Sequence, residues 1–514
     1  MIPADPADFV LDVSLKDEAA TARLAVDIAR LLLPGDLVAL SGGLGAGKTA
    51  FARFLIRALA GDEALEVPSP TFTLVQSYDY PRGVIVHADF YRLKSDAELV
   101  ELGWDELTDK AVTVAEWVEN APASLRADRL DLYFFIDVAA GDSFRRAMLV
   151  ARGALAPRLR RFLAIEAMLA GSAWAQAKRS YMQGDASSRA YEKLTKPDGE
   201  TAILMISPPR PDGPPVRDGK PYSTVARLAE NILPFIGMDN GLRAQGFSAP
   251  RIIASDLDAG LAIIEDFGAE GIARADAPVP ERYAEAAAVL ARLHRLSLPD
   301  SVPVANGTVH QIPPYDLDAL CIEVELLADW YAPHIGKIRL TPTARGVFTS
   351  LWRYRLQVVL AAPATWTLRD YHSPNLIWLG GRNGLARVGL IDFQDCVMGH
   401  PAYDVASLMQ DARISVPDEL ELRLLGHYAR LRKMNEPEFD MQAFAGAYAI
   451  MGAQRATKIL GIFARLDKRD RKPQYLAHLP RIEAYLRKNL AHPMLAELKA
   501  WYEQHLPKLV IPAA

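Results

Sequence analysis

The chain has 514 residues, half of them hydrophobic and a quarter charged, which is the composition of a folded globular protein and excludes a disordered or fibrous chain. At roughly 100–200 residues per domain, two to four domains are expected. No apolar run approaches the roughly 18 residues of a membrane span, so no membrane association is expected. The acidic, proline-broken start lacks a secretory pattern. The two cysteines, Cys321 and Cys396, are too isolated for a disulfide framework or a zinc site, and together these features predict a cytoplasmic protein.

Charge is distributed unevenly along the chain. Residues 1–152 hold 15 Lys and Arg against 24 Asp and Glu, whereas the remainder holds 43 against 39. An acidic segment is poorly suited to gripping a nucleic-acid backbone, so we expect no direct contact with DNA and contact with RNA only through a partner protein. The alternative is that this charge only keeps the surface soluble.

The first 150 residues alternate between helical and strand-like patterns. Residues 17–33 carry apolar side chains at helical spacing, residues 36–42 form a short apolar run that ends in glycine, and residues 48–60 fit a helix. The later runs GVIVHAD, AVTVAEW and RLDLYFFIDV fit three further strands. This alternation predicts an α/β sheet.

A phosphate-binding loop is predicted between the first buried strand and the helix that follows it. Its sequence, GGLGAGKT, fits the pattern G-x-x-x-x-G-K-[ST] in the context that the pattern requires. Glycines let backbone N–H groups face phosphate oxygens, and the helix N-terminus adds positive potential. The Lys would reach the β- and γ-phosphates, and the Thr hydroxyl would ligate Mg²⁺. The alternative is a glycine-rich turn with a solvated lysine. The predicted loop residues are Gly42, Gly45, Gly47, Lys48, Thr49 and Ala50.

Two carboxylates, Asp89 and Glu116, directly follow expected strands. Ligands of open α/β sheets bind where strands end, so one carboxylate could hold Mg²⁺ and the other could position the attacking water. We treat both as candidate catalytic residues and Glu116 also as a metal ligand. Each, considered alone, also fits an ordinary surface carboxylate.

The first part of the chain resembles a known family. The stretches LVALSGGLGAGKT, PSPTFTLVQSY, HADFYRL and VAEWVENAP occur in order within about residues 10–152. They are similar to the TsaE family of small P-loop ATPases, which serve bacterial threonylcarbamoyladenosine synthesis on tRNA in a complex with the TsaD and TsaB proteins. The resemblance implies ATP and Mg²⁺ as cofactors, TsaD and TsaB as partners, and tRNA as an indirect one. The nucleotide-binding set that it implies is Lys48, Thr49, Thr71, Asp89, Glu116 and Trp117.

A second unit is predicted after a seam near residues 150–161, where Pro157 starts a basic helix. Residues 180–268 are rich in strand patterns, whereas long helices dominate from about residue 279, with a short strand pair at 375–393. A small, mostly β lobe followed by a large, mostly α lobe predicts a two-lobed, kinase-like plan.

A catalytic loop of the kinase type is predicted in the stretch RDYHSPN. Phosphoryl transfer needs an oriented acceptor hydroxyl, a base near it and metal ions on the phosphates. Asp370 would be that base, Asn375 would hold Mg²⁺, and Asp392, after the next apolar strand, would be the second metal ligand.

Other residues of this unit have two possible readings. His372 fits a loop-shaping residue better than a base. Asp404 either braces the catalytic loop through hydrogen bonds or caps the following helix.

Two segments of the small lobe are expected to contact the nucleotide. Residues 184–194 would form the turn over the phosphates, and residues 261–268 would lead into the hinge beside the adenine.

One departure from the kinase pattern concerns the strand TAILMISPP, which should offer a Lys to the α- and β-phosphates. It has Met205 there instead. The missing cation indicates either a pseudokinase or another cation in that role, for which Arg189 is the candidate.

Residues from about 158 to 500 resemble the aminoglycoside-phosphotransferase and choline-kinase superfamily. The stretches GDASSRAY, ILMISPP, IIEDFG and LRDYHSPNLIWL are most similar to its AmgK group, which also lacks the Lys on this strand. That resemblance implies phosphorylation of the anomeric hydroxyl of N-acetylmuramate and N-acetylglucosamine in cell-wall recycling.

The sequence as a whole predicts an α/β P-loop NTPase domain over residues 1–155, followed by a two-lobed α+β, protein-kinase-like domain over residues 158–510. The small lobe would span about 158–268 and the large lobe about 269–510. Three alternatives remain open. The second domain could phosphorylate another hydroxylated substrate such as an aminoglycoside, or it could bind nucleotide without catalysis. The first domain could be a nucleotide-gated scaffold with negligible hydrolysis.

Overall fold

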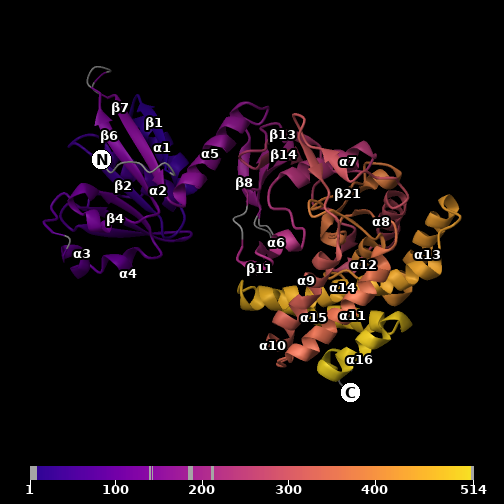
Figure 1. Cartoon of the computed structure of the whole chain (residues 1–514). Coiled ribbons are helices and arrows are strands. Elements are labelled where there is room, and N and C mark those ends of the chain that lie inside the picture. Colours follow the sequence, from indigo (N-terminus) through magenta and orange to yellow (C-terminus); the bar gives the residue numbers. More distant parts are fainter. Residues whose placement is uncertain are drawn as a thin grey trace. The chain divides into compact units, whose positions relative to one another are not determined.

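The computed structural model describes residues 8–95, 97–137, 141, 143–182, 189–209 and 213–510. The chain divides into two compact units, Met1–Ala173 and Trp174–Ala514 (Figure 1).

The first unit is built on a seven-stranded sheet. Its four central strands, β6, β2, β5 and β4, run parallel, and antiparallel strands extend the sheet at both edges. In sheet order the strands are β1 (Phe9–Leu15), β7 (Arg145–Arg152), β6 (Arg129–Ile136), β2 (Leu37–Gly42), β5 (Val112–Glu116), β4 (Gly83–Asp89) and β3 (Val75–Tyr80). The helices are α1 (Glu18–Leu31), α2 (Lys48–Ala60), α3 (Ala97–Glu101), α4 (Trp104–Thr108) and α5 (Leu155–Ala170).

Strand β2 is buried on both faces, which explains its continuously apolar sequence. Val38 and Leu40 belong to the core formed with α1 and α2, whereas Leu37 and Ala39 belong to the core formed with α3 and α4. A strand buried on both faces cannot alternate apolar and polar side chains. The helices predicted over 17–33 and 48–60 are present as α1 and α2, and the three later apolar runs form β4, β5 and β6.

Helix α5 begins within the predicted seam. It packs against α1, β1 and β7 of the first unit, so the compact units divide after Ala173, later in the chain than the seam predicted near residues 150–161. The residue bounds of the two functional domains remain our proposal.

The second unit begins with a small lobe around a five-stranded antiparallel sheet. Phe235 of α7 (Leu233–Ala244) in this lobe stacks on Phe393, which directly follows Asp392, with ring centroids 5.2 Å apart and planes at 8°. In sheet order the strands are β13 (Ile252–Asp256), β14 (Leu261–Glu265), β10 (Thr201–Ile206), β9 (Ala190–Thr195) and β8 (Lys178–Met182). Two helices, α6 (Tyr222–Val225) and α7 (Leu233–Ala244), and the hairpin β11 (Pro215–Arg217) and β12 (Lys220–Pro221) accompany the sheet.

The large lobe is mostly helical, as the sequence predicted. The predicted strand pair within 375–393 is present as β20 and β21. The helices are α8 (Pro280–Leu293), α9 (Leu317–Leu326), α10 (Ala332–His334), α11 (Pro342–Leu360), α12 (Ala402–Met409), α13 (Asp418–Asn435), α14 (Met441–Lys468), α15 (Leu479–Leu490), α16 (Ala496–His505) and α17 (Pro507–Val510). The strand pairs are β15 (Ala273–Arg274) with β16 (Ala277–Pro278), β17 (Ser301–Pro303) with β18 (Val309–Gln311), β19 (Thr365–Thr367) with β22 (Val397–Gly399), and β20 (Leu376–Trp378) with β21 (Val388–Leu390).

Helix α14 is the long central helix of this lobe, and its neighbours approach it closely at glycines. A Cβ atom at Gly461 would lie 2.4 Å from the carbonyl carbon of Leu326, and one at Gly446 would lie 2.6 Å from the sulfur of Met494. Gly461 therefore requires glycine, because the backbone of Leu326 cannot move aside, whereas at Gly446 the flexible end of the Met494 side chain can shift.

Among the described residues, no helix combines the length and the apolar composition that crossing a membrane would require.

Candidate active sites in the two units

The loop between β2 and α2 has the backbone that its glycines predict. Gly42, Gly45 and Gly47 have φ angles of 143°, 72° and 108°, a region that residues with a side chain rarely adopt. Gly42 is also required by space, because a Cβ atom there would lie 2.5 Å from the carbonyl oxygen of Phe134. Ala50 lies in the first turn of α2, whose N–H groups are directed toward this loop.

Lys48 is held inside the loop. Its Nζ donates to the carbonyl oxygens of Gly42 and Gly43 at 2.7 and 3.0 Å, and it lies 3.5 Å from the centre of the Trp117 ring. Burial lowers the pKa of Lys48 below its ordinary value, against the opposing effect of Glu116. Trp117 has a left-handed backbone with φ 59°, a strained conformation of the kind often found at functional sites.

The two predicted carboxylates lie next to each other. Asp89 ends β4 and Glu116 ends β5, and they are paired residues of these parallel strands. Glu116 accepts a hydrogen bond from Thr49 Oγ1 at 2.7 Å, and Asp89 accepts one from Thr71 Oγ1 at 2.6 Å. Because Mg²⁺ binds oxygen ligands and is usually held by one or two protein groups plus phosphates, the adjacent oxygens of Thr49 and Glu116 fit it.

Two residues of this site were missed in the sequence. His87 Nε2 lies 3.0 Å from the second carboxylate oxygen of Glu116, and Ser69 donates to Asp89 at 2.8 Å. His87 is two residues before Asp89 on β4, so strand alternation places both on one face and could have revealed it.

The catalytic loop of the second unit connects β19 to β20. Asp404 accepts hydrogen bonds from the backbone N–H groups of Leu368 at 2.6 Å and Arg369 at 2.9 Å. It lies within α12, after the Pro401 N-cap, so it braces the loop and does not cap the helix. Arg369 has φ 67°, and a left-handed residue here turns the chain toward Asp370.

Asn375 is hydrogen-bonded within the loop, and Asp392 follows a residue whose backbone is hydrogen-bonded to it. The Asn375 amide nitrogen donates to the carbonyl oxygen of Asp370 at 3.0 Å, which directs its amide oxygen away from the loop. The N–H of Ile391 donates to the carbonyl oxygen of Asn375 at 3.1 Å, so the residue before Asp392 is fixed to the same loop. Gln394 donates to Asp392 Oδ1 at 2.9 Å.

The two carboxylates of this loop have opposite electrostatic environments. Burial alone would raise the pKa of Asp370, but His372 and Lys458 more than offset it and hold that pKa below its usual value. Burial raises the pKa of Asp392, with Arg189 opposing and Asp370 adding to the rise. Asp370 is therefore kept ionised, as a base must be, whereas Asp392 needs a cation beside it.

Arg189 supplies such a cation. Its Nη1 lies 3.0 Å from Asp392 Oδ1, although the two residues are more than two hundred positions apart. Met205 is fully buried in β10 between Tyr191 and Ala262 and offers no charge. Of the predicted phosphate turn, 184–194, residues 184–188 lie outside the described part of the chain, and residues 190–194 lie in β9 and so form a strand rather than a turn.

A buried charge network that no sequence pattern indicated supports the loop. Glu323 of α9 is completely buried, pairs with Arg369, and accepts from Lys458 Nζ at 2.8 Å. Lys458 lies on α14 and acts on Asp370 electrostatically. These residues belong to no local motif, so only the fold brings them to the loop.

Among the described residues, no group of three or more His, Cys, Asp or Glu side chains could hold a metal ion by itself. Asn375 and Asp392 nevertheless fit Mg²⁺, because that ion is commonly held by few protein oxygens together with substrate phosphates. The structure thus brings all the described candidate residues together in two separate sites, and their chemical roles remain predictions.

Comparison with known proteins finds two families in the chain. Residues 15–144 match the family described as threonylcarbamoyl adenosine biosynthesis protein TsaE, and residues 180–446 match the phosphotransferase enzyme family. An N-acetylmuramate/N-acetylglucosamine kinase of Caulobacter vibrioides is 37% identical over 353 residues, covering 66% of this chain and 95% of the relative. A tRNA threonylcarbamoyladenosine biosynthesis protein TsaE of Rickettsia typhi is 42% identical over 106 residues, covering 21% of this chain and 73% of the relative. The solved structure of the amicoumacin kinase hAmiN is 16% identical, covers 66% of this chain and 96% of that chain, and has a TM-score of 0.43.

Proposed function

Since the chain belongs to the phosphotransferase enzyme family, and its first unit to the TsaE family, we propose that it is a bifunctional enzyme with two ATP sites. The second unit transfers the γ-phosphoryl group of ATP to the anomeric hydroxyl of N-acetylmuramate or N-acetylglucosamine. The first unit is a P-loop ATPase that supports threonylcarbamoyladenosine formation on tRNA together with TsaD and TsaB.

The observation that carries the kinase proposal is the pair of hydrogen bonds that joins Asp370 to Asn375 and Asn375 to Ile391, the residue before Asp392. Asp370, which its lowered pKa keeps ionised, orients the acceptor hydroxyl and accepts its proton as transfer proceeds. Asn375 and Asp392 hold Mg²⁺, which neutralises charge on the phosphates when it is bound. Arg189 supplies the cation that Met205 does not, and this favours an active kinase over a pseudokinase.

The test of the kinase proposal is phosphate transfer from ATP to the two amino sugars by the whole protein. Asp370→Asn should lower formation of sugar 1-phosphate by at least about 100-fold, because it removes the base, while ATP binding by the second unit persists. Aminoglycosides serve as competing acceptors, and phosphorylation of these instead of the amino sugars would overturn the substrate assignment. Full transfer by Asp370→Asn would overturn the role of that residue.

The observation that carries the ATPase proposal is the set of contacts around Glu116 and Lys48. Lys48 lies in the glycine loop, where it can reach the β- and γ-phosphates, and Thr49 with Glu116 provides two adjacent oxygens for Mg²⁺. Asp89, held by Thr71, is placed to orient the attacking water at the same edge of the sheet.

The test of the ATPase proposal is ATP hydrolysis in the presence and absence of TsaD and TsaB. We expect weak hydrolysis alone, stimulation by the two proteins, and loss of the stimulated rate in Lys48→Ala. Asp370→Asn, which changes only the other site, is the matched control and should retain stimulation. Unchanged stimulated hydrolysis in Lys48→Ala would refute the assignment.

A further inference from the structure

Three cationic side chains lie on one face of helix α14, which passes beside the catalytic loop. Arg455, Lys458 and Arg465 are separated by three and seven residues, spacings that return to the same side of an α-helix. Arg455 and Lys458 both act electrostatically on Asp370, so this face is directed toward the catalytic loop. At a rise of about 1.5 Å per residue, Lys458 and Arg465 are ~10 Å apart along the helix.

The two cations nearer the loop already have partners. Lys458 pairs with the buried carboxylate of Glu323 at 2.8 Å and also acts on Asp370. Arg455 Nη1 donates to the carbonyl oxygen of Gln410 at 3.1 Å, and Arg455 is almost fully buried. These two residues therefore support the catalytic base and are not available to bind an anionic group of the acceptor.

Arg465 differs from them because, within the described part of the chain, no carboxylate pairs with it. Its guanidinium group lies 4.9 Å from the centre of the Tyr222 ring, and burial lowers its pKa below the ordinary value. Asp470, a carboxylate that acts on Arg465, is itself bound by Arg469 at 2.7 Å. A partly buried arginine without an anion is costly, and an anionic ligand would remove that cost.

Tyr222 connects Arg465 to the surroundings of the catalytic loop. It begins α6 and packs against the small core formed by Val225 and Ile322. Burial, with Glu323 adding to the effect, raises the pKa of Tyr222 to about 12, and Arg465 and Lys458 both oppose this rise. Tyr222 is therefore a neutral neighbour of both cations, and the two lie in one continuous region of the large lobe.

The end of the Arg465 side chain is open to a ligand. Nε is enclosed without a partner, but neither Nη atom is among the enclosed, unpartnered atoms of the described residues. Arg465 is correspondingly only partly buried. The guanidinium group can thus offer N–H donors to a carboxylate without a change of the fold.

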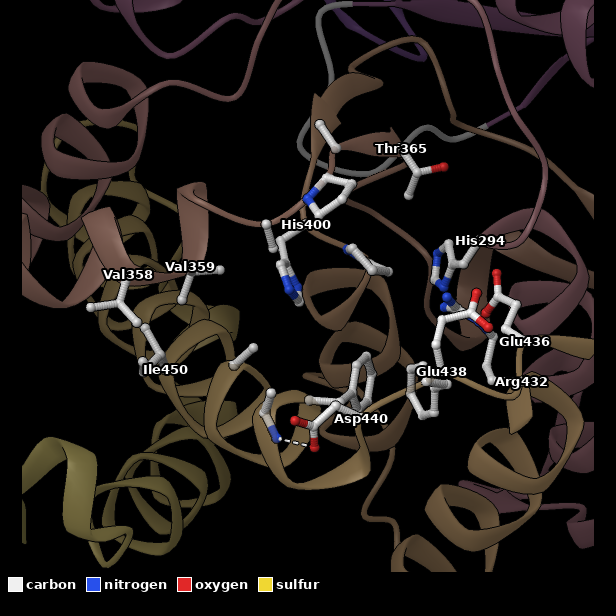
Figure 2. A pocket seen from close by; sticks show the side chains of 18 of the residues that line it. His294, Val358, Val359, Thr365, His400, Arg432, Glu436, Glu438, Asp440 and Ile450 are labelled. Carbon is white, nitrogen blue, oxygen red and sulfur yellow. Dashed lines mark hydrogen bonds and ion pairs between the residues drawn. The ribbon is translucent and has the colours of Figure 1, made fainter.

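A cavity of about 760 Å³ elsewhere in the large lobe does not offer the same chemistry (Figure 2). It lies at the ends of α8, α11 and α13, and neither Asp370 nor any of the three α14 cations lines it. Arg432, which does line it, is paired with Glu436 at 2.5 Å. An anionic acceptor that must reach Asp370 is therefore better matched by the face of α14 than by this cavity.

We propose that Arg465 binds the lactyl carboxylate of N-acetylmuramate while the anomeric hydroxyl lies at Asp370, an inference that rests on the amino-sugar kinase function proposed above. N-Acetylglucosamine has a neutral hydroxyl where N-acetylmuramate carries the lactyl ether, so it gains no ion pair with Arg465. The planar guanidinium group matches a carboxylate with paired N–H donors. Asp370 thus serves both sugars, whereas Arg465 sets the preference between them.

The experiment measures kcat/KM of the whole protein for N-acetylmuramate, its methyl ester and N-acetylglucosamine. Arg465→Met should lower kcat/KM for N-acetylmuramate about 10- to 100-fold more than for N-acetylglucosamine, because a charge-assisted hydrogen bond is lost. The wild type should prefer the acid to its neutral methyl ester by a similar factor, and Arg465→Met should lose that preference. Arg465→Lys, which keeps the charge but not the paired donors, should be intermediate.

Arg469→Met is the matched control, since Arg469 lies one turn further along and is already paired with Asp470. It should leave the ratio of the two sugars unchanged. Equal losses for both sugars in Arg465→Met, or a preference for the acid over its ester that survives in this variant, would overturn the inference and leave the kinase function standing. Absence of transfer to either sugar by the wild type would overturn both.

Discussion

Replacing Asp404 by Asn should separate the activity of the kinase unit from its stability. The carboxylate accepts from two backbone N–H groups, those of Leu368 and Arg369, whereas an amide can accept with one oxygen only. One hydrogen bond to a charged group contributes ~1.5–3 kcal/mol. If this bond fixes the loop in the transition state, kcat falls by about 10- to 100-fold, since 1.4 kcal/mol corresponds to a factor of ten.

The stability of the folded protein should rise in Asp404→Asn, although kcat falls. Burial raises the pKa of Asp404 from 3.8 to about 7, with the two backbone N–H groups opposing the rise. The folded protein therefore keeps the proton to higher pH than the unfolded chain, and this carboxyl group destabilises the wild type progressively as pH rises from 3.8 to 7. Three pKa units correspond to ~4 kcal/mol as an upper limit, and the amide avoids this cost.

The assay is the pH profile of kcat for sugar phosphorylation, with denaturant unfolding of the same samples. Below pH 7 the protonated Asp404 also has one good acceptor, so wild type and Asp404→Asn should be similar there. Above pH 7 the ratio of the wild-type kcat to the kcat of Asp404→Asn should rise to the full factor of about 10 to 100. Asp258→Asn, at an exposed position, is the control and should change neither quantity. Equal kcat values well above pH 7 in a folded Asp404→Asn enzyme would refute this role.

Two further predictions concern buried charges of the second unit. Arg189→Met should lower kcat/KM for ATP by about 10- to 100-fold, because a charge-assisted contact is lost. The control Arg179→Met, which breaks the Arg179–Glu192 pair on β8 and β9, should leave kcat/KM unchanged. An unchanged kcat/KM in Arg189→Met would show that another group replaces the missing lysine. Asp239 is fully buried with both carboxylate oxygens unpartnered, and burial raises its pKa to about 8. The stability advantage of Asp239→Asn over wild type should therefore grow by up to ~1.4 kcal/mol per pH unit as pH rises between 3.8 and 8. Denaturant unfolding of both proteins, with kinase activity as the probe, measures this difference. A difference in stability that does not change with pH would contradict this reasoning.

The parts of the fold and sites that the sequence revealed are those encoded in short segments. The glycines before Lys48 predict the left-handed backbone angles of that loop. The positions of Asp89 and Glu116 at strand ends predict that both lie at one edge of the sheet. The spacing of Asp370 and Asn375 likewise lies within a single loop. Local chemistry was therefore sufficient for these residues, although their roles remain to be tested.

Contacts between distant segments could not be predicted in the same way. The pairing of β1 with β7 depends on register across most of the first unit, and helix α5 packs on that unit although its sequence marks a seam. Glu323 reaches Arg369 and Lys458 only because α9 and α14 pack together. Nothing in the spacing of these residues distinguishes them from ordinary surface charges.

The glycines of α14 have a consequence for any experiment that scores every substitution by growth. At Gly461 every replacement, alanine included, must displace the backbone of Leu326, so this position would score as intolerant as Asp370, whereas at Gly446 the end of the Met494 side chain can move aside. The pattern of tolerated residues separates the two causes. Loss at a helix crossing follows side-chain volume, whereas loss at a reacting group follows chemistry and spares no isostere. A cluster of intolerant positions along α14 would thus mark where two helices touch and would be misread as a third catalytic centre.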